Sequence, residues 1–517
     1  MDATLEPSLP DEPREFGFYM GGRFVAAGSR GLAERVSPAH GVAATRVPAC
    51  TADDVESAVG LARKAFADGV WSRLSGAERA QVLLGAAAGV RDRLEELAYW
   101  ETLETGKPIS QSRSEVQASA GYYEYAAGVA RTLSGDSFNN LGEGMFGLVV
   151  REPIGVVGLI TPWNFPFLIL AERLPFMLAA GCTVVAKPSE FTSATTLMMA
   201  EILTGAGLPD NVFNVVTGFG LPVGQAITAH EDIDMVSFTG SVATGRRALA
   251  ASATNIKKLG LELGGKSPQI VYADADLEAA ADGVVYGVCL NAGQCCVSGS
   301  RVVVEASAAE AFQELLVQKF ARVRVGDPLD PRTQMGAIVT EAHCQKILGY
   351  IRSGVEAGAR IACGGGTLES RGWFIEPTLL VDVRNDMAVA QEEIFGPVLT
   401  MTTFETPEET ASSGSPRASG PGTSTRRCGP CAASGRGGPG STPPSRAGPN
   451  CPSADSSTRE TAGKPASTAS RNTRSSNPYT LRWARARHGC PRGANEPRQG
   501  EQDNARPGWA HPRRAPG

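Results

Sequence analysis

Short apolar runs alternate with amphipathic stretches over residues 16–409 of the chain. Four runs rich in Val, Ile and Leu have the near-continuous hydrophobicity of buried parallel strands: 155–161, 182–186, 211–216 and 234–238. Between them, residues 194–208 carry apolar side chains at helical spacing, and residues 308–320 show the same pattern further on. Strands and helices that alternate in this way predict βαβ units and the parallel sheet of a nucleotide-binding domain.

The alternation ends abruptly after Thr410. Residues 411–517 contain a single Leu, Leu481, and no Ile, Val, Phe or Met, while Gly, Pro, Ser, Thr, Ala and Arg dominate. Such a segment cannot bury enough apolar surface to offset the chain entropy lost on folding. We therefore expect a disordered tail over 410–517. A second interpretation is that the codons of this segment are read in the wrong frame.

Length and charge narrow the class of protein. With 517 residues the chain is long enough for two or three domains. A formal net charge of −5 and a sequence pI near 5.8 give no reason to expect nucleic acid or an acidic membrane as a partner. The N-terminal segment is acidic and rich in Pro, unlike a secretory signal, and no run approaches the roughly 18 apolar residues of a spanning helix.

The cysteines indicate a reducing compartment. Their number, 11, is odd, and they are scattered rather than regularly spaced. Cys428 and Cys431 form a CGPC that mimics a redox or metal half-site, but this sequence has no second pair and no βαβ pattern around it. We expect a cytoplasmic protein without a bound metal.

Three segments carry candidate chemistry. The segment NAGQCCVSGSR places Cys295 and Cys296 after Gly-Gln, which suits a thiol nucleophile, although a buried, unreactive site is the commoner fate of Cys. In LELGGKSP, Glu262 is an isolated acid in an apolar strand, and is either ion-paired or a desolvated general base. In TPWNFP, either Asn164 donates its amide to a developing oxyanion or the segment is a plain turn.

Taken together, the ordered motifs TPWNFP, VAKPSE, SFTGS, ELGGKSP, GQCC and EEIFGP resemble the NAD(P)-dependent aldehyde dehydrogenase superfamily, in its non-acylating branch. The resemblance covers residues 16–409. It implies an α/β fold with a Rossmann-like cofactor domain, an α/β catalytic domain and a β-hairpin oligomerisation arm. The domain bounds that it implies are 1–132 and 153–263 for the cofactor domain, 133–152 for the arm and 264–409 for a truncated catalytic domain.

The resemblance implies a role for each candidate catalytic residue. The Cys296 thiolate would attack the aldehyde carbonyl, with Cys295 as a packed neighbour. The Asn164 amide and the backbone N–H of Cys296 would hold the oxyanion. After hydride transfer, Glu262 would deprotonate the water that hydrolyses the thioester, a residue that the CoA-acylating branch lacks. None of the five histidines lies in a motif beside Cys296, so a Cys–His protease or transferase has little support.

The resemblance also implies a site for NAD. Lys187 and Glu190 match residues that hold the adenosine ribose, and the Glu190 carboxylate favours NAD because it would repel the 2′-phosphate of NADP. An NADP-preferring semialdehyde dehydrogenase is the rival that Glu190 argues against. The other matched positions are expected around the adenine, the pyrophosphate and the nicotinamide: Thr161, Trp163, Gly220, Gly224, Gly240, Ser241, Glu393 and Phe395.

Glu172 bears on the substrate, an aldehyde that the sequence does not identify. It follows Asn164 by two turns of an expected helix, FLILAERL, and matches a position that borders the aldehyde tunnel. An acid there would favour a cationic aldehyde, such as betaine aldehyde or an aminoaldehyde. The alternative is that this carboxylate pairs with Arg173 or another neighbour.

The family pattern bears on the tail as well. It should continue after EEIFGP with a PFGG segment, which is missing. Permitted codons for residues 450–474, read from the third base of the Asn450 codon, yield LPFGGFKHSGNGRETGKHGLEEYT, which resembles the C-terminal end of this family. We therefore expect a frameshift somewhere after about Glu409. Such a chain would form an impaired homo-oligomer, because one edge of the oligomerisation sheet is lost. A catalytically inactive NAD-binding remnant is the alternative function.

Overall fold

The computed structural model describes residues 8–413. Residues 414–517, for which a disordered or frameshifted tail is predicted, lie outside the described part of the chain. Helix α14 (Pro407–Ser413) runs past Glu409, so helical structure continues beyond the boundary expected from the sequence. Pro at the first helical position and two acids in the first turn, Glu408 and Glu409, suit the start of this helix.

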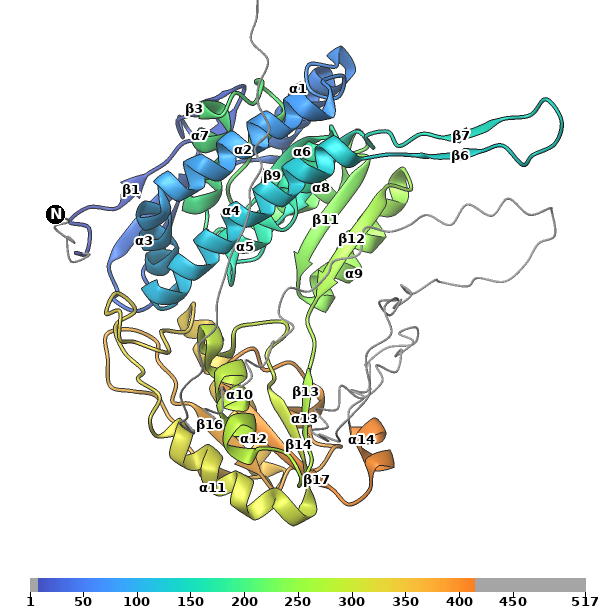
Figure 1. The fold of residues 1–517 in the computed structure, drawn as a ribbon. Helices are drawn as coiled ribbons and strands as arrows, with labels where there is room; N and C mark the ends of the chain where they lie inside the picture. Colours follow the sequence, from blue (N-terminus) through green and yellow to red (C-terminus); the bar gives the residue numbers. More distant parts are fainter. Residues whose placement is uncertain (1–7, 414–517) are drawn as a thin grey trace, which may run out of the picture. The chain divides into compact units, whose positions relative to one another are not determined.

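A seven-stranded sheet carries the predicted βαβ units (Figure 1). The four runs predicted as buried parallel strands are confirmed as β8 to β11, and β12 joins them in parallel, whereas β2 pairs antiparallel with β10. The strands lie in the order β12 (Lys258–Leu263), β11 (Met235–Gly240), β8 (Val156–Ile160), β9 (Thr183–Lys187), β10 (Phe213–Val215), β2 (Phe18–Met20) and β3 (Arg23–Val25).

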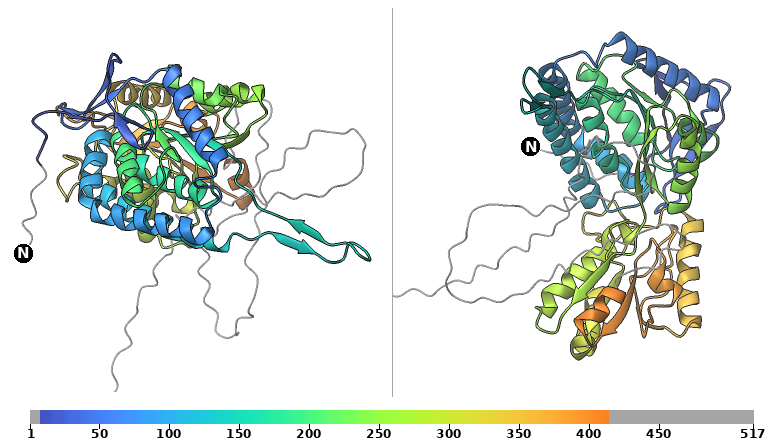
Figure 2. Two further views of the ribbon diagram at one scale, coloured as in Figure 1. Left: turned by 90° about the horizontal axis from the view of Figure 1, so that it is seen from above. Right: turned by 90° about the vertical axis from the view of Figure 1, so that its right-hand side faces the viewer.

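Helices cover both faces of this sheet, as the two views of Figure 2 show. Successive strand residues face different cores: Val157 and Val184 belong to the larger core, and Val156 and Val185 to a smaller one. The larger core includes α2 (Gly76–Asp92), α3 (Leu94–Thr105), α4 (Ile109–Thr132), α5 (Pro166–Ala171), α6 (Leu174–Ala179) and α7 (Ala194–Gly205). The smaller core includes α1 (Ala52–Asp68) and α8 (Gln225–Ala229).

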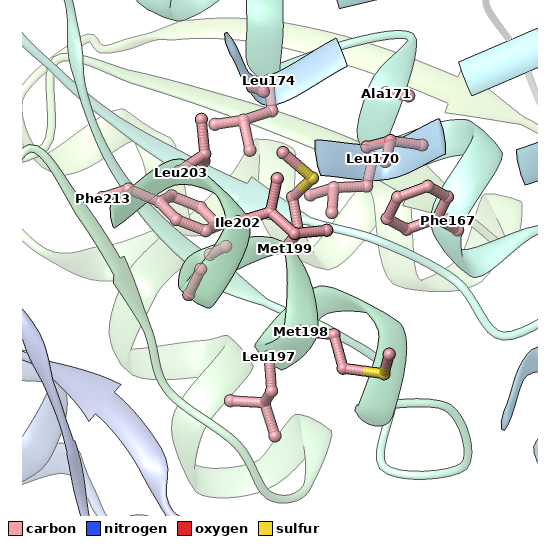
Figure 3. Close-up of a cluster of buried hydrophobic side chains, with 14 of the residues drawn as sticks. Phe167, Leu170, Ala171, Leu174, Leu197, Met198, Met199, Ile202, Leu203 and Phe213 are labelled. Atoms are coloured by element: carbon pink, nitrogen blue, oxygen red, sulfur yellow. The ribbon is translucent and has the colours of Figure 1, made fainter. Parts of the chain in front are cut away.

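Figure 3 shows the part of the larger core where α5 and α7 meet. Phe167 and Leu170 come from α5, Met199 and Leu203 from α7, and all four are fully buried. Each such side chain stabilises the fold by about 1.5–3 kcal/mol through removal from water. The predicted helix at 194–208 is therefore confirmed as α7, and its packing on α5 fixes the segment that follows Asn164.

The prediction that Glu172 and Asn164 lie on one face of the same helix is wrong. Asn164 precedes α5, whose N-cap is Phe165, and Glu172 is the C-cap of this short helix. Helix α6 then starts anew with Pro175 in its first turn. Since Pro has no N–H to extend the hydrogen-bond ladder, the chain cannot run on as one helix.

A five-stranded sheet follows in the sequence. Its order is β13 (Pro268–Val271), β14 (Arg301–Glu305), β17 (Val398–Phe404), β16 (Thr378–Val381) and β15 (Arg360–Cys363), with only β15 antiparallel. The helix predicted at 308–320 is confirmed as α11 (Ala309–Phe320). The other helices packed in this region are α10 (Leu277–Cys289), α12 (Glu341–Glu356) and α13 (Ala388–Gln391).

Two small sheets complete the described part of the chain. One consists of β1 (Arg14–Glu15), β5 (Ala43–Pro48) and β4 (Leu32–Val36). The other is the hairpin of β6 (Asp136–Phe138) and β7 (Gly147–Val149), which extends away from the end of α4 (Figure 1). Within residues 8–413, no helix has both the length and the hydropathy needed to cross a membrane.

Candidate active site

Residues 290–296 form the centre of the candidate site, and this segment is called the nucleophile turn because it carries the candidate nucleophile, Cys296. It begins where α10 ends, with the irregular turn η3 (Leu290–Gly293). Residues 291–293 have left-handed φ values of 49°, 52° and 70°. Such values cost about 1–3 kcal/mol at each residue that carries a side chain. At Gly293 no side chain fits, because a Cβ would lie 2.1 Å from the main-chain oxygen of Gly396 in the EEIFGP segment.

Side-chain amides hold this turn in place. Asn291 Nδ2 donates to the main-chain oxygen of Asn164 at 2.8 Å, and Asn164 Nδ2 donates in return to the main-chain oxygen of Gln294 at 3.0 Å. Gln294 donates to the Asn291 oxygen at 3.0 Å and accepts from the Val339 N–H at 2.9 Å. The three amide side chains are buried. Because of these bonds, the TPWNFP and GQCC segments lie against each other.

The two adjacent cysteines have different surroundings. Cys295 is buried in an apolar cluster with Phe165, Leu168 and Ile169, whereas Cys296 is partly exposed. A hydrogen bond from the Cys295 thiol lowers the pKa of Cys296, and the same bond together with burial raises the pKa of Cys295. Since the thiolate is the nucleophilic form, these surroundings favour Cys296 over Cys295 as a candidate nucleophile.

Glu262 departs from the expectation of a desolvated acid. It lies on β12, the edge strand of the seven-stranded sheet, and its side chain is 53% exposed. Its carboxylate lies 3.5 Å from the guanidinium of Arg173. An edge strand has a neighbour on one side only, so apolar residues flanking an acid in the sequence do not enclose it in space. The structure therefore contains the ion pair, and the role of Glu262 as a base stays a prediction.

Gly264 and Gly265 make room for Glu393. A Cβ at residue 264 would lie 1.9 Å from Glu393 Oε2, and the Gly265 N–H donates to Glu393 Oε1 at 3.2 Å. On residue 265 a Cβ would lie 3.4 Å from the main-chain oxygen of Cys296. Burial raises the pKa of Glu393. The glycine pair therefore brings three sequence motifs together, those of Glu262, Cys296 and Glu393.

Three aromatic rings lie close together beside Glu393. Trp163 and Phe395 lie edge to face, 5.4 Å between ring centres and at 90°, and His343 lies 5.6 Å from Trp163. His343 Nε2 donates to the main-chain oxygen of Phe395 at 2.7 Å, and burial lowers the pKa of this histidine. Its hydrogen bond fixes the left-handed backbone of Phe395, whose φ is 60°. Sequence reasoning missed His343, because no motif surrounds it.

Lys187 and Glu190 meet at the end of β9. Lys187 Nζ donates to the Pro188 oxygen at 2.8 Å and lies 3.5 Å from a Glu190 carboxylate oxygen. Burial lowers the pKa of Lys187. A Cβ on Gly224 would be 3.7 Å from Lys187 Cδ, so the turn η1 (Gly220–Gly224) lies beside this pair. An ammonium and a carboxylate thus share one small region with a glycine-containing turn.

The neighbouring strands end with small or polar residues. The Thr161 N–H donates to the Lys187 oxygen at 3.2 Å, and the buried Thr161 hydroxyl has no hydrogen-bond partner within the described protein. Gly240 is the last residue of β11, and exposed Ser241 is the N-cap of α9 (Val242–Ala251), where its hydroxyl accepts from the Thr244 N–H at 3.3 Å. The carboxyl edge of a parallel sheet is where such folds bind nucleotides.

The fold and the site together define a class of protein. It is a doubly wound α/β chain in which a nucleotide-binding sheet lies against the nucleophile turn. The family model described as "Aldehyde dehydrogenase family" matches residues 24–413, and the chain belongs to this family. It is 41% identical over 393 residues to aldehyde dehydrogenase family 2 member C4 of Arabidopsis thaliana, across 76% of this chain and 78% of that protein.

Solved structures support the same assignment. An NAD-dependent aldehyde dehydrogenase from Sinorhizobium meliloti is 48% identical, with a TM-score of 0.77 over 79% of this chain and 83% of that one. Betaine aldehyde dehydrogenase from Staphylococcus aureus, in complex with NAD+, is 34% identical, with a TM-score of 0.75 over 77% of this chain and 80% of that one. The α/β fold class expected from the sequence is confirmed.

Proposed function

We propose that the chain oxidises an aldehyde to a carboxylate with NAD, through covalent intermediates on Cys296. The observation that supports this most is the 3.0 Å hydrogen bond from Asn164 to Gln294, because it holds an amide donor against the turn that carries a partly exposed thiol of lowered pKa. The similar structures are those of NAD-dependent enzymes that act on aldehydes.

In the first step the Cys296 thiolate adds to the carbonyl carbon, and the carbonyl π electrons move to oxygen. An amide nitrogen has two hydrogens, and Asn164 uses one of them on Gln294. The second hydrogen, together with the Cys296 N–H, is proposed to stabilise the oxyanion of the thiohemiacetal. A preorganised donor of this kind contributes about 10²–10³-fold to the rate of acyl-transfer enzymes.

Two observations fit a bound dinucleotide. Gly264 and Gly265 admit the Glu393 carboxylate beside the backbone of Cys296, where it could accept from a ribose hydroxyl, and the buried Thr161 hydroxyl lacks a partner among residues 8–413. We assign Glu393 and Phe395 to the nicotinamide end, with Trp163 supporting the Phe395 ring, and Lys187 and Glu190 to the adenosine ribose. Bound NAD would accept the hydride from the carbon attached to Cys296, which leaves a thioester.

The remaining cofactor positions are proposed at the phosphates and the adenine. Gly240 and Ser241 lie at the start of α9, where free main-chain N–H groups favour a pyrophosphate. Gly220 and Gly224 flank the turn beside Lys187 and are assigned to the adenine cleft. A carboxylate at Glu190 supports NAD over NADP, since a 2′-phosphate would be repelled.

Hydrolysis of the thioester requires a base, and we assign this role to Glu262. Its carboxylate would take a proton from water, the hydroxide would add to the thioester carbon, and the Cys296 thiolate would leave as the carboxylate product forms. To reach the water, Glu262 must release Arg173. That costs little, because a partly exposed ion pair is worth only about 0–1 kcal/mol.

A cationic aldehyde is the substrate class that Glu172 supports. The Tyr122 hydroxyl donates to the Glu172 carboxylate at 3.3 Å, and Tyr122 packs against the apolar cluster that contains Cys295. Arg173 forms an ion pair with Glu262, and its charge also lowers the pKa of Glu172, but burial outweighs this effect. Burial raises the pKa of Glu172, and a cation in the channel would favour the ionised form.

The hairpin of β6 and β7 is proposed as the self-association arm. Its apolar side chains are largely exposed, including Met145 at 60%, Phe146 at 65% and Leu148 at 66%. Exposed apolar residues concentrated on one element mark a protein contact. We extend this proposal to a homo-oligomer, which the lost native C-terminus would impair if the frameshift prediction holds.

The decisive experiment is an assay of NADH formation by the purified chain with betaine aldehyde, an aminoaldehyde and a neutral aldehyde. NAD and NADP are compared, and a chain with the C-terminal reading frame restored is assayed in parallel. We expect turnover with NAD in the restored chain. Absence of turnover there would reject the proposed activity. Turnover in the restored chain alone would identify the present 517-residue chain as an inactive remnant.

A further inference from the structure

A cluster of buried charges lies behind the nucleophile turn and takes no part in the proposed chemistry. Lys107, between α3 and α4, donates to Glu101 at 3.0 Å and to Glu115 at 2.5 Å. The side chains of all three are at most 6% exposed. Desolvation offsets much of the attraction in such a buried group, so its contribution to stability does not by itself explain its presence.

Burial favours an additional proton in this cluster. Two carboxylates around one ammonium would leave a buried negative charge. Burial, with repulsion from Glu101, raises the pKa of Glu115 to about 8. Glu101 Oε2 is a buried oxygen without a hydrogen-bond partner in the described protein, and a proton shared with Glu115 would give it one. With this proton the cluster of Lys107, Glu101 and Glu115 is neutral, and each member is fixed by the others.

Gln111 connects this cluster to the nucleophile turn. From α4 its Nε2 donates to Glu115 Oε1 at 2.8 Å, and its Oε1 accepts from the main-chain N–H of Asn291 at 3.2 Å. Asn291 is the first of the three left-handed residues before Gln294. Without Gln111 this main-chain N–H would lose its acceptor at the point where the turn departs from helical geometry.

The charged cluster also contacts the segment that contains Asn164. Lys107 Nζ lies 4.5 Å from the centre of the Phe165 ring, close enough for a cation–π interaction. Phe165 follows Asn164 in the chain and packs in the apolar cluster with Cys295. The charged cluster therefore supports both segments whose mutual hydrogen bonds form the candidate site.

We infer that Gln111 is a positioning residue for Cys296. By holding the Asn291 N–H against the rigid cluster of Lys107, Glu101 and Glu115, it keeps the turn in the path that presents the Cys296 thiol. The inference rests on the proposed role of Cys296 as the nucleophile. It concerns the geometry of the turn and is independent of which aldehyde or cofactor binds.

Alkylation of Cys296 by iodoacetamide tests the inference in the full chain without substrate or cofactor. The rate is followed by mass spectrometry of the Cys296 peptide as a function of pH. Gln111→Met removes the acceptor, and Gln117→Met, at an exposed position of the same helix, is the matched control. Loss of one hydrogen bond should raise the pH midpoint of alkylation by about half a unit, a threefold lower thiolate fraction, with an unchanged plateau rate at high pH.

Hydrogen exchange of the peptide that contains residue 291 gives a second readout. Gln111→Met should accelerate it, whereas Gln117→Met should preserve the parental rate. Equal behaviour of Gln111→Met and Gln117→Met in both measurements would overturn the inference. Failure of the proposed activity looks different: no NADH forms, while the alkylation and exchange effects persist.

Discussion

The side-chain amide of Asn164 donates to the main-chain oxygen of Gln294 at 3.0 Å, across 130 positions of sequence. This bond ties the segment after β8 to the nucleophile turn. The main-chain oxygen of Asn164 in turn accepts from Asn291 at 2.8 Å, so the two segments are joined in both directions. The amide that is proposed to hold the oxyanion is consequently fixed relative to Cys296 before any substrate binds.

Replacement of the two cysteines should separate their roles. In the frame-restored chain, Cys296→Ala removes the proposed nucleophile and should abolish NADH formation. Cys295→Ala should leave most of it, although the loss of the thiol that lowers the pKa of Cys296 should move the activity profile to higher pH. Steady-state assays over a range of pH check both. Equal losses in the two variants, or an active Cys296→Ala variant, would refute the assignment.

Glu262→Gln keeps the shape of the side chain but cannot accept a proton. In the frame-restored chain, acylation and the first hydride transfer should persist, while hydrolysis of the thioester slows by about 10²-fold or more. Rapid-mixing measurements should show a burst of NADH followed by slow turnover. Steady-state rates like those of the parent would remove Glu262 from the mechanism.

Glu172→Gln tests the substrate class. The neutral amide loses the charge that favours a cationic aldehyde, so kcat/KM for betaine aldehyde should fall by about tenfold, the effect of about 1.4 kcal/mol. The value for a neutral aldehyde of equal length should change little. The comparison uses the frame-restored chain with both substrates. An unchanged ratio between the two would reject the proposed role of Glu172.

Glu104 should make stability depend on pH. It is fully buried, and burial raises its pKa from 4.5 to about 7. Because the folded state keeps the proton that the unfolded chain releases, the stabilisation is complete below pH 4.5 and is lost as the pH rises towards 7. The loss amounts to at most about 3 kcal/mol.

Glu104→Gln imitates the protonated form and should remove this part of the pH dependence. Urea unfolding of the parent and the variant at both ends of the range checks the prediction, since other titrating groups contribute equally to the two proteins. A difference in free energy of unfolding that stays constant with pH would contradict it.

Gly293→Ala should damage the nucleophile turn. Its left-handed φ disfavours any side chain, and a Cβ would meet the oxygen of Gly396 at 2.1 Å. We expect destabilisation of about 2 kcal/mol or more and a change in the alkylation rate of Cys296. Gly121→Ala is the matched control, because a Cβ there meets nothing and Ala stabilises a helix interior by about 1 kcal/mol. Chemical unfolding of both variants should give effects of opposite sign.

The parallel sheet could be predicted from the sequence because each of its strands corresponds to a short run of residues with a recognisable pattern. The runs that became β8, β9 and β11 are almost wholly apolar since helices cover both faces of the sheet. No local sequence pattern predicted that the Glu262 side chain would be exposed. This exposure depends on β12 being the edge strand, which is a property of the strand order and not of the residues around the acid.

The residues that hold the candidate site in place could not be predicted from the sequence either. The motif GQCC indicated Cys296, but Gln111, His343 and Val339 lie in segments without any recognisable pattern. Their contacts arise only when α4, α12 and the connection before α12 pack around the turn. The prediction that places Asn164 and Glu172 on one helical face was wrong because the helix begins only at Pro166, after Asn164, and the Pro that favours this start is present in the sequence.

The three left-handed residues at 291–293 also affect how the protein should age in storage. Strained backbone lowers the free energy of local opening, so this turn is expected to open more often than the sheets around it. Each opening frees Cys296 from its neighbours and exposes the thiol to oxidants. Preparations should therefore lose titratable Cys296 thiol while circular dichroism and the unfolding midpoint are still unchanged, and shelf life would be set by the turn, well before the fold itself fails.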